Sequence, residues 1–166
     1  MQIRISVRHG TLNDEVQSRI SAKFEKLSRL FDRLIVGVGI NVEKQGMFSS
    51  CERVNLIREA TAHLSNIQIE TFHGLAVEFV RRCGARVMVR GVRPITDIAA
   101  ELTMMMANRR LAPDIETLFM IADGELAHVS SSLIKEIAGL ASEQELARFL
   151  PPNVVRAVRE KLAGTI

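Results

Sequence analysis

The sequence of 166 residues contains no tryptophan and no tyrosine, and its only aromatic residues are seven phenylalanines. Proteins that bind single-stranded nucleic acid without sequence preference stack the bases on aromatic side chains, so we do not expect a partner of this kind. The net charge of +3 adds only a weak general attraction for anions. The composition therefore favours a small anionic substrate over nucleic acid.

The chain also has few cysteines and no long apolar segment. Its two cysteines, Cys51 and Cys83, lie far apart and outside any metal-ligand spacing, and we interpret them as free thiols in a reducing cytoplasm. No apolar run approaches the roughly 18 residues of a membrane span, and the N-terminus does not have the pattern of a signal peptide. We therefore expect a cytoplasmic protein with no membrane segment and no metal site built from its own side chains.

Short apolar segments alternate with amphipathic segments along the chain. Helical segments are indicated by apolar residues at three- and four-residue spacing, and two of them begin with capping boxes, Ser49-x-x-Glu52 and Ser142-x-x-Glu145. The alternation predicts one α/β domain over residues 1–166, a Rossmann-like open five-stranded parallel sheet with helices on both faces. The predicted strands are residues 2–7, 34–40, 66–72, 87–89 and 116–121.

Polar and charged residues follow several of these strands. In an open parallel sheet the carboxyl ends of the strands form one edge, and ligands bind there. The clearest segment is Arg90-Gly-Val-Arg93, which ends the apolar strand 87–89 and precedes a helix introduced by Pro94. Two arginines beside a helix N-terminus favour a phosphate group. Other residues expected at this edge are Arg8, His9, Thr11, Lys44, His73, Asp97, Glu101 and the segment 124–132.

Two features of the helix after Pro94 have more than one interpretation. Asp97 and Glu101 are four residues apart and therefore lie on one helix face. They could hold the hydroxyl groups of a ribose, or they could belong to a solvated face and pair with Arg93 or Arg109. The three methionines at positions 104–106 fit either core packing or a subunit contact.

From about residue 31 to residue 164 the sequence resembles bacterial phosphopantetheine adenylyltransferases. The Arg-Gly-x-Arg segment and the x-Ser-Ser-Ser-Leu-x-Lys-Glu segment, at this separation, are highly specific for that family. The resemblance implies a nucleotidyltransferase type of fold and the transfer of AMP from ATP to 4′-phosphopantetheine, a step of coenzyme A biosynthesis. The matching segments are 31–41, 44–48 with 52–54, 89–97, Glu101, 108–109, 111–113 and 129–136.

The resemblance also implies roles for individual residues. Lys44 and Arg93 are expected to stabilise charge during the reaction. The implied partners and cofactor are ATP, 4′-phosphopantetheine, Mg²⁺ carried with ATP, CoA as a feedback ligand, and further copies of the chain in a cytoplasmic homohexamer. The implied contacts of phosphopantetheine are Thr11, Lys44, Ala76 and Arg90. The implied contacts of ATP are Gly91, Val92, Arg93, Glu101, Leu126, Ala127, His128, Val129, Ser130, Ser131 and Ser132.

The first 33 residues depart from this family. The family's first helix opens with Thr-x-Gly-His, whose histidine stabilises charge on the transferred phosphoryl group, and the sequence contains no such segment. By length the histidine would fall near Arg19 or Ile20, so no catalytic histidine is assigned. Residues 1–10 and 25–33 resemble the start of ribosome hibernation promoting factors instead. We interpret residues 1–33 as an atypical first strand–helix unit and residues 34–166 as a family-like body.

The departure leaves three hypotheses for the function. The first is an adenylyltransferase that keeps ligand binding but turns over weakly, because a positioned charge-stabilising group is missing. The second is a catalytically inactive protein that binds nucleotide or CoA. The third is a ribosome-associated regulatory protein that uses the basic side chains of the first 33 residues, although such charges on a helix are usually only solvated.

Overall fold

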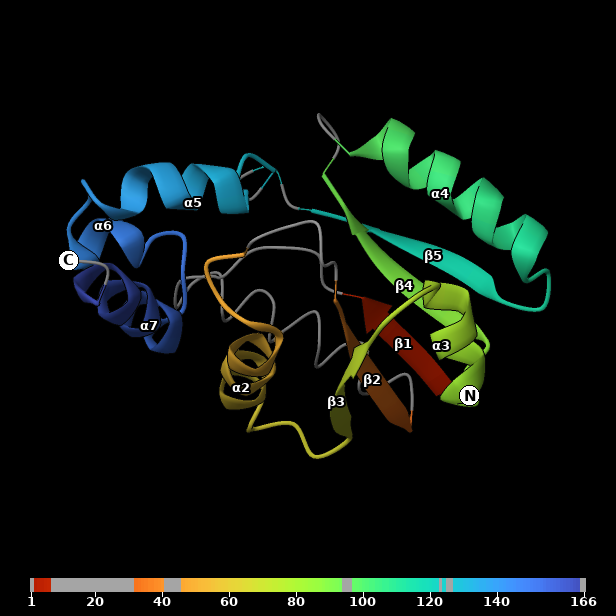
Figure 1. Ribbon diagram of the computed structural model, residues 1–166. Coiled ribbons are helices and arrows are strands. Elements are labelled where there is room, and N and C mark those ends of the chain that lie inside the picture. The colour runs from red at the N-terminus through yellow and green to blue at the C-terminus, as the bar shows by residue number, and fades with distance from the viewer. Residues whose placement is uncertain are drawn as a thin grey trace.

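The computed structural model describes residues 2–6 (backbone only), 32–40, 46–93, 97–122, 124 and 127–164. Within these residues five strands form one parallel sheet in the order β3-β2-β1-β4-β5 (Figure 1). The predicted Rossmann-like, five-stranded parallel sheet is confirmed. The strands are β1 (Gln2–Ser6), β2 (Arg33–Gly39), β3 (Ile67–Phe72), β4 (Val87–Val92) and β5 (Glu116–Ile121).

The helix ends agree with most of the local sequence signals. Ser49 and Ser142 each form a complete capping box, and Gly84 follows α3 with a φ of 68° that suits glycine. None of the described helices is long and apolar enough to cross a membrane. The helices are α2 (Ser50–Ala60), α3 (Ala76–Arg82), α4 (Ile98–Leu111), α5 (Ser131–Ala138), α6 (Glu143–Leu146) and α7 (Pro152–Ala163).

Two expectations about helices have a different outcome. The helix predicted from residue 13 or 14 to Arg33 lies outside the described residues up to residue 31, and so does Pro94. The predicted end of this helix is wrong, because Arg33 is the first residue of β2. The helix expected directly after Pro94 begins only at Ile98, with Asp97 at its N-cap position. The N-cap residue of α4 is therefore the residue whose side chain accepts hydrogen bonds from Arg93.

Helices cover both faces of the sheet, as predicted. On one face Phe79 of α3 stacks on Phe72 of β3, with ring centroids 4.6 Å apart, and packs with Ile35 of β2. On the other face α2 contacts β2 and β3, and Ile67 and Ile69 point toward it. Because successive strand residues point to opposite faces, Phe72 and Ile69 lie on different sides of the sheet. The helices α5 to α7 share a separate apolar cluster beside α2 (Figure 1).

The strand β4 is longer than the sequence predicted. The apolar run indicated an end at Val89, but the strand continues through Arg90 and Gly91 to Val92. Arg90 is paired in register with Ser6 of β1 and Phe119 of β5, so the ladder has partners on both sides. A buried charge can lie in such a strand because it is neutralised by a carboxylate from α4. The turn of the Arg-Gly-x-Arg segment therefore begins at its second arginine.

Candidate functional site

The strand order reverses between β1 and β4. From β1 the chain proceeds to β2 and β3 on one side, whereas β4 and β5 extend the sheet on the other side. This reversal of strand order is the point at which open α/β sheets bind ligands. The register brings Ser6, the last residue of β1, beside Arg90. The predicted arginine segment therefore lies at the edge where a ligand site is expected.

Arg90 forms a buried, bidentate ion pair with Glu101. Its Nε donates to Glu101 Oε2 at 2.9 Å and its Nη2 donates to Oε1 at 2.7 Å. Only 7% of Arg90 and 8% of Glu101 is exposed to solvent. A buried charge needs such a partner because burial removes its hydration. Glu101 therefore does not lie on a solvated helix face. The interpretation of Asp97 and Glu101 as residues of a solvated face is wrong for Glu101.

Arg93 is held by two different parts of the chain. Its Nε and Nη2 donate to the carboxylate of Asp97 at 2.6 and 2.8 Å, and its Nη1 donates to the backbone carbonyl of Val129 at 2.9 Å. The hydrogen bonds that Arg93 donates to Asp97 raise the pKa of its guanidinium above its usual value. The alternative that pairs Asp97 with Arg93 is confirmed. The link to Val129 joins the end of β4 to the segment that precedes α5.

The segment before α5 is ordered by burial and by a cap. Ala127 and Val129 are buried, and Ser130 Oγ accepts a hydrogen bond from the backbone N–H of Leu133 at 3.1 Å. Ser131 and Ser132 belong to the first turn of α5. The unpaired backbone N–H groups of a first helical turn favour an anion, as does the helix dipole. Arg93 and the start of α5 together form an arrangement suited to a phosphate.

The remaining predicted residues have different positions. Ala76 is the first residue of α3, directly beyond β3 at the carboxyl edge of the sheet. Apart from Gly91 and its two chain neighbours, no described residue has an atom within 4 Å of the position that a Cβ on Gly91 would take, so a ligand can approach the backbone there. His128 is exposed and its ring meets that of Phe149 edge to face, with centroids 6.0 Å apart. Thr11, Lys44 and Leu126 lie outside the described residues.

The chemistry of this edge is that of charge stabilisation. Guanidinium groups offer planar, paired donors that match phosphate oxygens. Among the residues that the structure describes, no three His, Cys, Asp or Glu side chains are grouped so that they could hold a metal ion. The two nearby carboxylates, Asp97 and Glu101, both bind arginines. The arrangement can position phosphate groups by hydrogen bonds from Arg93 and from the start of α5.

Sequence reasoning missed two contacts of the site. The Arg90–Glu101 pair joins residues 11 apart in sequence, and the carbonyl of Val129 is 36 residues from Arg93. A signal for the first contact exists in the sequence, since an arginine at the end of an apolar central strand requires a buried acceptor. The backbone acceptor at Val129 has no such signal, because every residue carries a carbonyl group.

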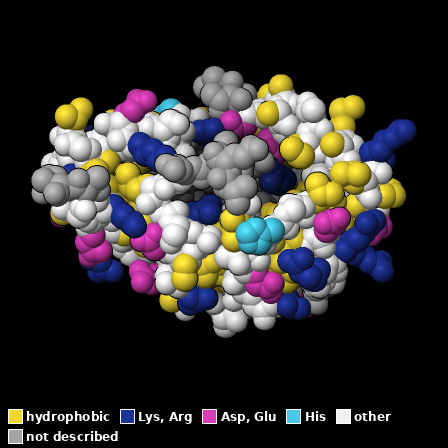
Figure 2. Space-filling model, in the orientation of Figure 1, with side chains coloured by type: hydrophobic (Ala, Val, Ile, Leu, Met, Phe, Trp, Pro, Cys, Tyr) yellow, Lys and Arg dark blue, Asp and Glu magenta, His cyan; other side chains and the backbone are white. Residues whose placement is uncertain are grey.

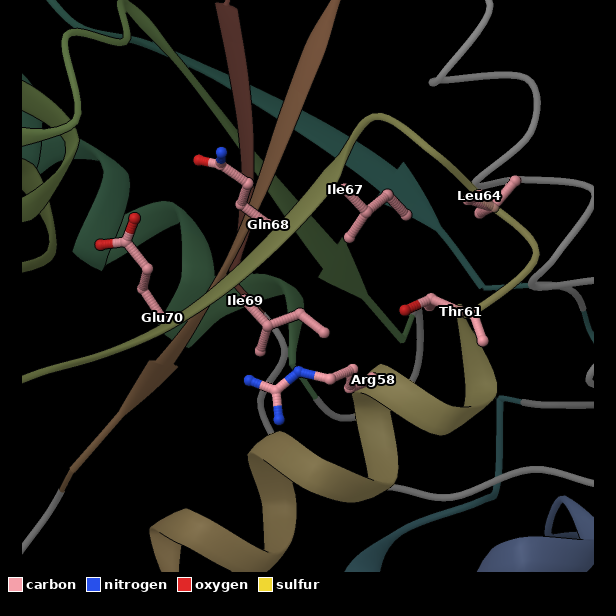
Figure 3. A pocket seen from close by; sticks show the side chains of 8 residues that line it. Arg58, Thr61, Leu64, Ile67, Gln68, Ile69 and Glu70 are labelled. Carbon is pink, nitrogen blue, oxygen red and sulfur yellow. The ribbon is translucent and has the colours of Figure 1, made fainter.

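A surface pocket of about 510 Å³ lies elsewhere, between the end of α2 and the first half of β3 (Figure 3). Arg58 and Thr61 border it from the helix side, and none of the predicted site residues lines it. The amino end of β3 belongs to the edge of the sheet opposite the arginines, because all five strands are parallel. This pocket is therefore separate from the candidate site.

Comparison with known proteins gives consistent similarities. The family model of cytidylyltransferase-like proteins matches residues 22–137, a range that includes β4, α4 and most of α5. A phosphopantetheine adenylyltransferase from Rhodopirellula baltica is 54% identical over 141 residues, which are 84% of this chain and 79% of that protein. The enzyme of the same name from Heliobacterium modesticaldum is 40% identical over 142 residues, 86% of this chain and 83% of that protein. That from Clostridium perfringens strain SM101 is 36% identical over 160 residues, 96% of each chain.

Proposed function

Because the chain belongs to the phosphopantetheine adenylyltransferase family, we propose that it transfers AMP from ATP to 4′-phosphopantetheine, forming dephospho-CoA and pyrophosphate. The observation that carries the proposal at the level of the site is the position of Arg93. Its bonds to Asp97 and Val129 place a guanidinium between the end of β4 and the N-terminus of α5. Two elements whose chemistry favours phosphate thus meet at the switch point of the sheet.

The reaction needs no covalent intermediate with the enzyme. An oxygen of the phosphopantetheine phosphate attacks the α-phosphorus of ATP, and the bond from that phosphorus to the β-phosphate oxygen breaks to release pyrophosphate. We assign Arg90 to the acceptor phosphate and Arg93 to ATP, with Lys44 as a further charge stabiliser. Positioning and neutralisation of charge then supply the rate enhancement. This role suits a site with arginines and a helix N-terminus.

We further propose that turnover is weak. The sequence contains no Thr-x-Gly-His segment, and no histidine occurs between His9 and His63. Loss of one positioned group that stabilises transition-state charge lowers a rate by roughly 10²–10³-fold. Ligand binding depends on other contacts and is retained. The protein is therefore proposed to bind both substrates well and convert them slowly.

Magnesium is proposed to enter with the nucleotide. Mg²⁺ keeps several waters and commonly binds to substrate phosphates together with one or two carboxylates. The carboxylates of Asp97 and Glu101 are bound to arginines, which fits an ion held mainly by ATP oxygens. When bound, the ion would neutralise charge on the triphosphate, beside the residues that orient it.

Self-association is proposed to use α4. Hydrophobic side chains gather over α4 and β5 on the face shown in Figure 2. Met104 and Met106 are 42% and 67% exposed, so the interpretation of these two residues as core residues is wrong. The other interpretation, that they belong to a subunit contact, is the one that we propose. An exposed apolar patch of this kind commonly marks a protein contact. A homohexamer, feedback binding of CoA and a cytoplasmic location follow from the family resemblance as further proposals.

The proposed function is tested by measuring pyrophosphate release with ATP and 4′-phosphopantetheine, and by calorimetric titration with each substrate and with CoA. We expect binding of all three ligands and a turnover far below that of a relative containing Thr-x-Gly-His. A turnover equal to that of the relative would contradict the proposed weakness. Failure to bind every ligand would contradict the function itself.

Two variants make this test specific to the arginine site. Arg93→Met removes the guanidinium between β4 and α5, and we expect ATP binding to weaken by at least about tenfold. Arg110→Met removes a charge of the same kind from the exposed end of α4, and we expect unchanged binding. Equal effects of the two substitutions would show that only the net charge of the protein matters.

A further inference from the structure

The helix α5 begins at the candidate site, and an arginine of α7 binds its other end. Arg159 donates from Nη1 to the backbone carbonyl of Ala138, the last residue of α5, at 2.9 Å. Its Nη2 donates to the carbonyl of Ala141, in the segment between α5 and α6. One guanidinium therefore holds the end of α5 and the segment that follows it.

We propose that Arg159 is a positioning residue of the nucleotide site. It fixes the direction of α5, and thereby the place of the backbone N–H groups that the first turn of α5 offers to ATP. The proposal rests on the proposed function, because it takes the start of α5 as a contact of ATP. Arg159 does not itself contact the ligand, since a helix of eight residues rises about 12 Å from one end to the other.

The carbonyl of Ala138 depends on a donor from outside the helix. The last four carbonyl groups of an α-helix have no partner within the helix. Ala138 is 0% exposed, so water cannot easily replace Arg159 as this partner. A cation at this end of a helix also interacts favourably with the helix dipole. Arginine suits the position because its two terminal nitrogens can donate to two carbonyls at once.

The apolar contacts of α5 also lead to α6 and α7. Its two buried residues, Ile134 and Ala138, are four apart and therefore lie on one face of the helix. They belong to the same apolar cluster as Leu146 of α6 and Val158 of α7. Because Val158 directly precedes Arg159, one turn of α7 supplies both an apolar and a polar contact. We infer that α7 determines where α5 lies.

The position of α5 is thus defined from both ends. Before its first residue, the carbonyl of Val129 accepts a hydrogen bond from Arg93 at 2.9 Å. Beyond its last turn, Arg159 connects it to α7, which is attached to α2 by a hydrogen bond of 3.1 Å from Asn153 Nδ2 to the carbonyl of Leu56. A helix held at both ends presents its N–H groups in a fixed place, and less entropy is lost when a phosphate binds.

The experiment titrates ATP and 4′-phosphopantetheine separately into the full chain, into Arg159→Met and into Lys161→Met. Arg159→Met keeps an unbranched side chain but removes the donors. We expect it to weaken ATP binding by about fivefold and phosphopantetheine binding by less than about twofold. Lys161→Met is the control, because it removes a cation of α7 that pairs with α2 instead of α5. It should leave both affinities unchanged.

Two further variants separate positioning from a general loss of stability. Arg159→Lys keeps a cation that can donate to a carbonyl, and it should bind ATP more tightly than Arg159→Met does. Ile115→Val removes one buried carbon atom at the amino end of β5, on the edge of the sheet opposite the site. It should lower stability without changing ATP binding. Failure of Arg159→Lys to restore binding would overturn the proposal, and so would an equal loss of ATP binding in Ile115→Val.

Hydrogen exchange reports on the start of α5 without ATP. The backbone N–H of Leu133 donates to Ser130 Oγ in the first turn of the helix. We expect this N–H to exchange faster in Arg159→Met than in the parent, and at the parental rate in Lys161→Met. Unchanged exchange in Arg159→Met would contradict the proposal, because the first turn would then not depend on Arg159.

The remaining outcomes are also decisive. An Arg159→Met protein that loses affinity for both ligands equally overturns the proposal, because a selective role predicts a loss for ATP. Circular dichroism establishes folding, and if Arg159→Met does not fold, Arg159→Gln is judged by the same criteria. If the parent does not bind ATP, the proposed function fails and the role of Arg159 fails with it. If the parent binds both ligands and the variant matches it, only the role of Arg159 fails.

Discussion

The two arginine–carboxylate pairs of the site have the same chemistry and different surroundings. The Arg90–Glu101 pair lies within the protein, with side chains 8% and 10% exposed. The Arg93–Asp97 pair lies at the rim, with side chains 30% and 28% exposed. The first joins a strand to a helix across the fold, whereas the second joins residues four apart in the chain.

Because of this difference in burial, we expect the Arg90–Glu101 pair to matter mainly for stability and the Arg93–Asp97 pair mainly for ligand binding. A buried pair loses hydration on both sides, so each partner depends on the other and the pair resists breaking. A pair at the rim keeps part of its hydration and contributes little to stability, but its remaining donors can reach a ligand. We therefore expect Glu101 to affect folding most and Asp97 to affect ligand binding with little effect on folding.

The largest effect is expected from Glu101→Ala, which leaves the Arg90 charge buried without this partner. The free energy of unfolding should fall by about 3–5 kcal/mol, measured by urea denaturation. The double variant Arg90→Met with Glu101→Leu should recover most of this loss, because the buried charge is removed as well. If the free energy of unfolding of the single variant fell by less than about 1 kcal/mol, the pair would not be buried from solvent, contrary to the structure.

A smaller effect is expected from Asp97→Ala at the rim. Exposed and half-exposed pairs contribute about 0–1 kcal/mol, so the urea midpoint should move only slightly. ATP binding by the same protein should weaken much more than its stability does. A destabilisation as large as that of Glu101→Ala would remove the contrast between the two pairs.

Salt should act on the two pairs to different extents. At about 1 M ionic strength the screening length is roughly 3 Å, and screening acts mainly on groups in contact with solvent. The destabilisation caused by Asp97→Ala should therefore be smaller in about 1 M sodium chloride than in about 0.1 M. The loss in Glu101→Ala should stay nearly constant, and equal salt dependence would contradict the difference in burial.

The smallest effect is expected at an exposed pair distant from the site. Lys161 Nζ lies 2.7 Å from Glu52 Oε1 and joins α7 to α2. The hydrogen bond from Lys161, with further bonds from Ser49, lowers the pKa of Glu52 from 4.5 to about 2. Because the pKa in the folded state is the lower one, the stabilisation is present above pH 4.5 and is lost as the pH falls toward 2.

Urea midpoints of the parent and of Glu52→Gln test this prediction. The variant should be slightly less stable at pH 7, and the difference should disappear as the pH approaches the lowered pKa. Lys161→Met should show the same dependence, since it removes the main cause of the shift. A difference between parent and variant that persists unchanged at low pH would assign the effect to packing instead of charge.

Much of the fold was predictable because its signals are local. The capping boxes at Ser49 and Ser142 involve residues three apart, and both form as predicted. The strands β2, β3 and β5 were predicted to within about one residue of their bounds. Of these, only β2 is a continuous apolar run buried on both faces, whereas most residues of β3 and β5 are exposed or half-buried. The predicted end of β4 was wrong. The strand continues through Arg90 because Glu101, from a helix further along the chain, neutralises the charge of this arginine.

The sequence by itself determined the alternation of strands and helices along the chain and the family. It also gave the pairing of Asp97 with Arg93 as one interpretation, beside a contact of Asp97 with a ribose. These follow from periodicity, motifs and a four-residue spacing, which act within a few residues of one another. Only the tertiary structure decided that Arg90 binds Glu101 and that Arg93 reaches the carbonyl of Val129. Both contacts depend on the packing of α4 and of the segment before α5 against the end of β4, and residues far apart in the chain meet only after the sheet has formed.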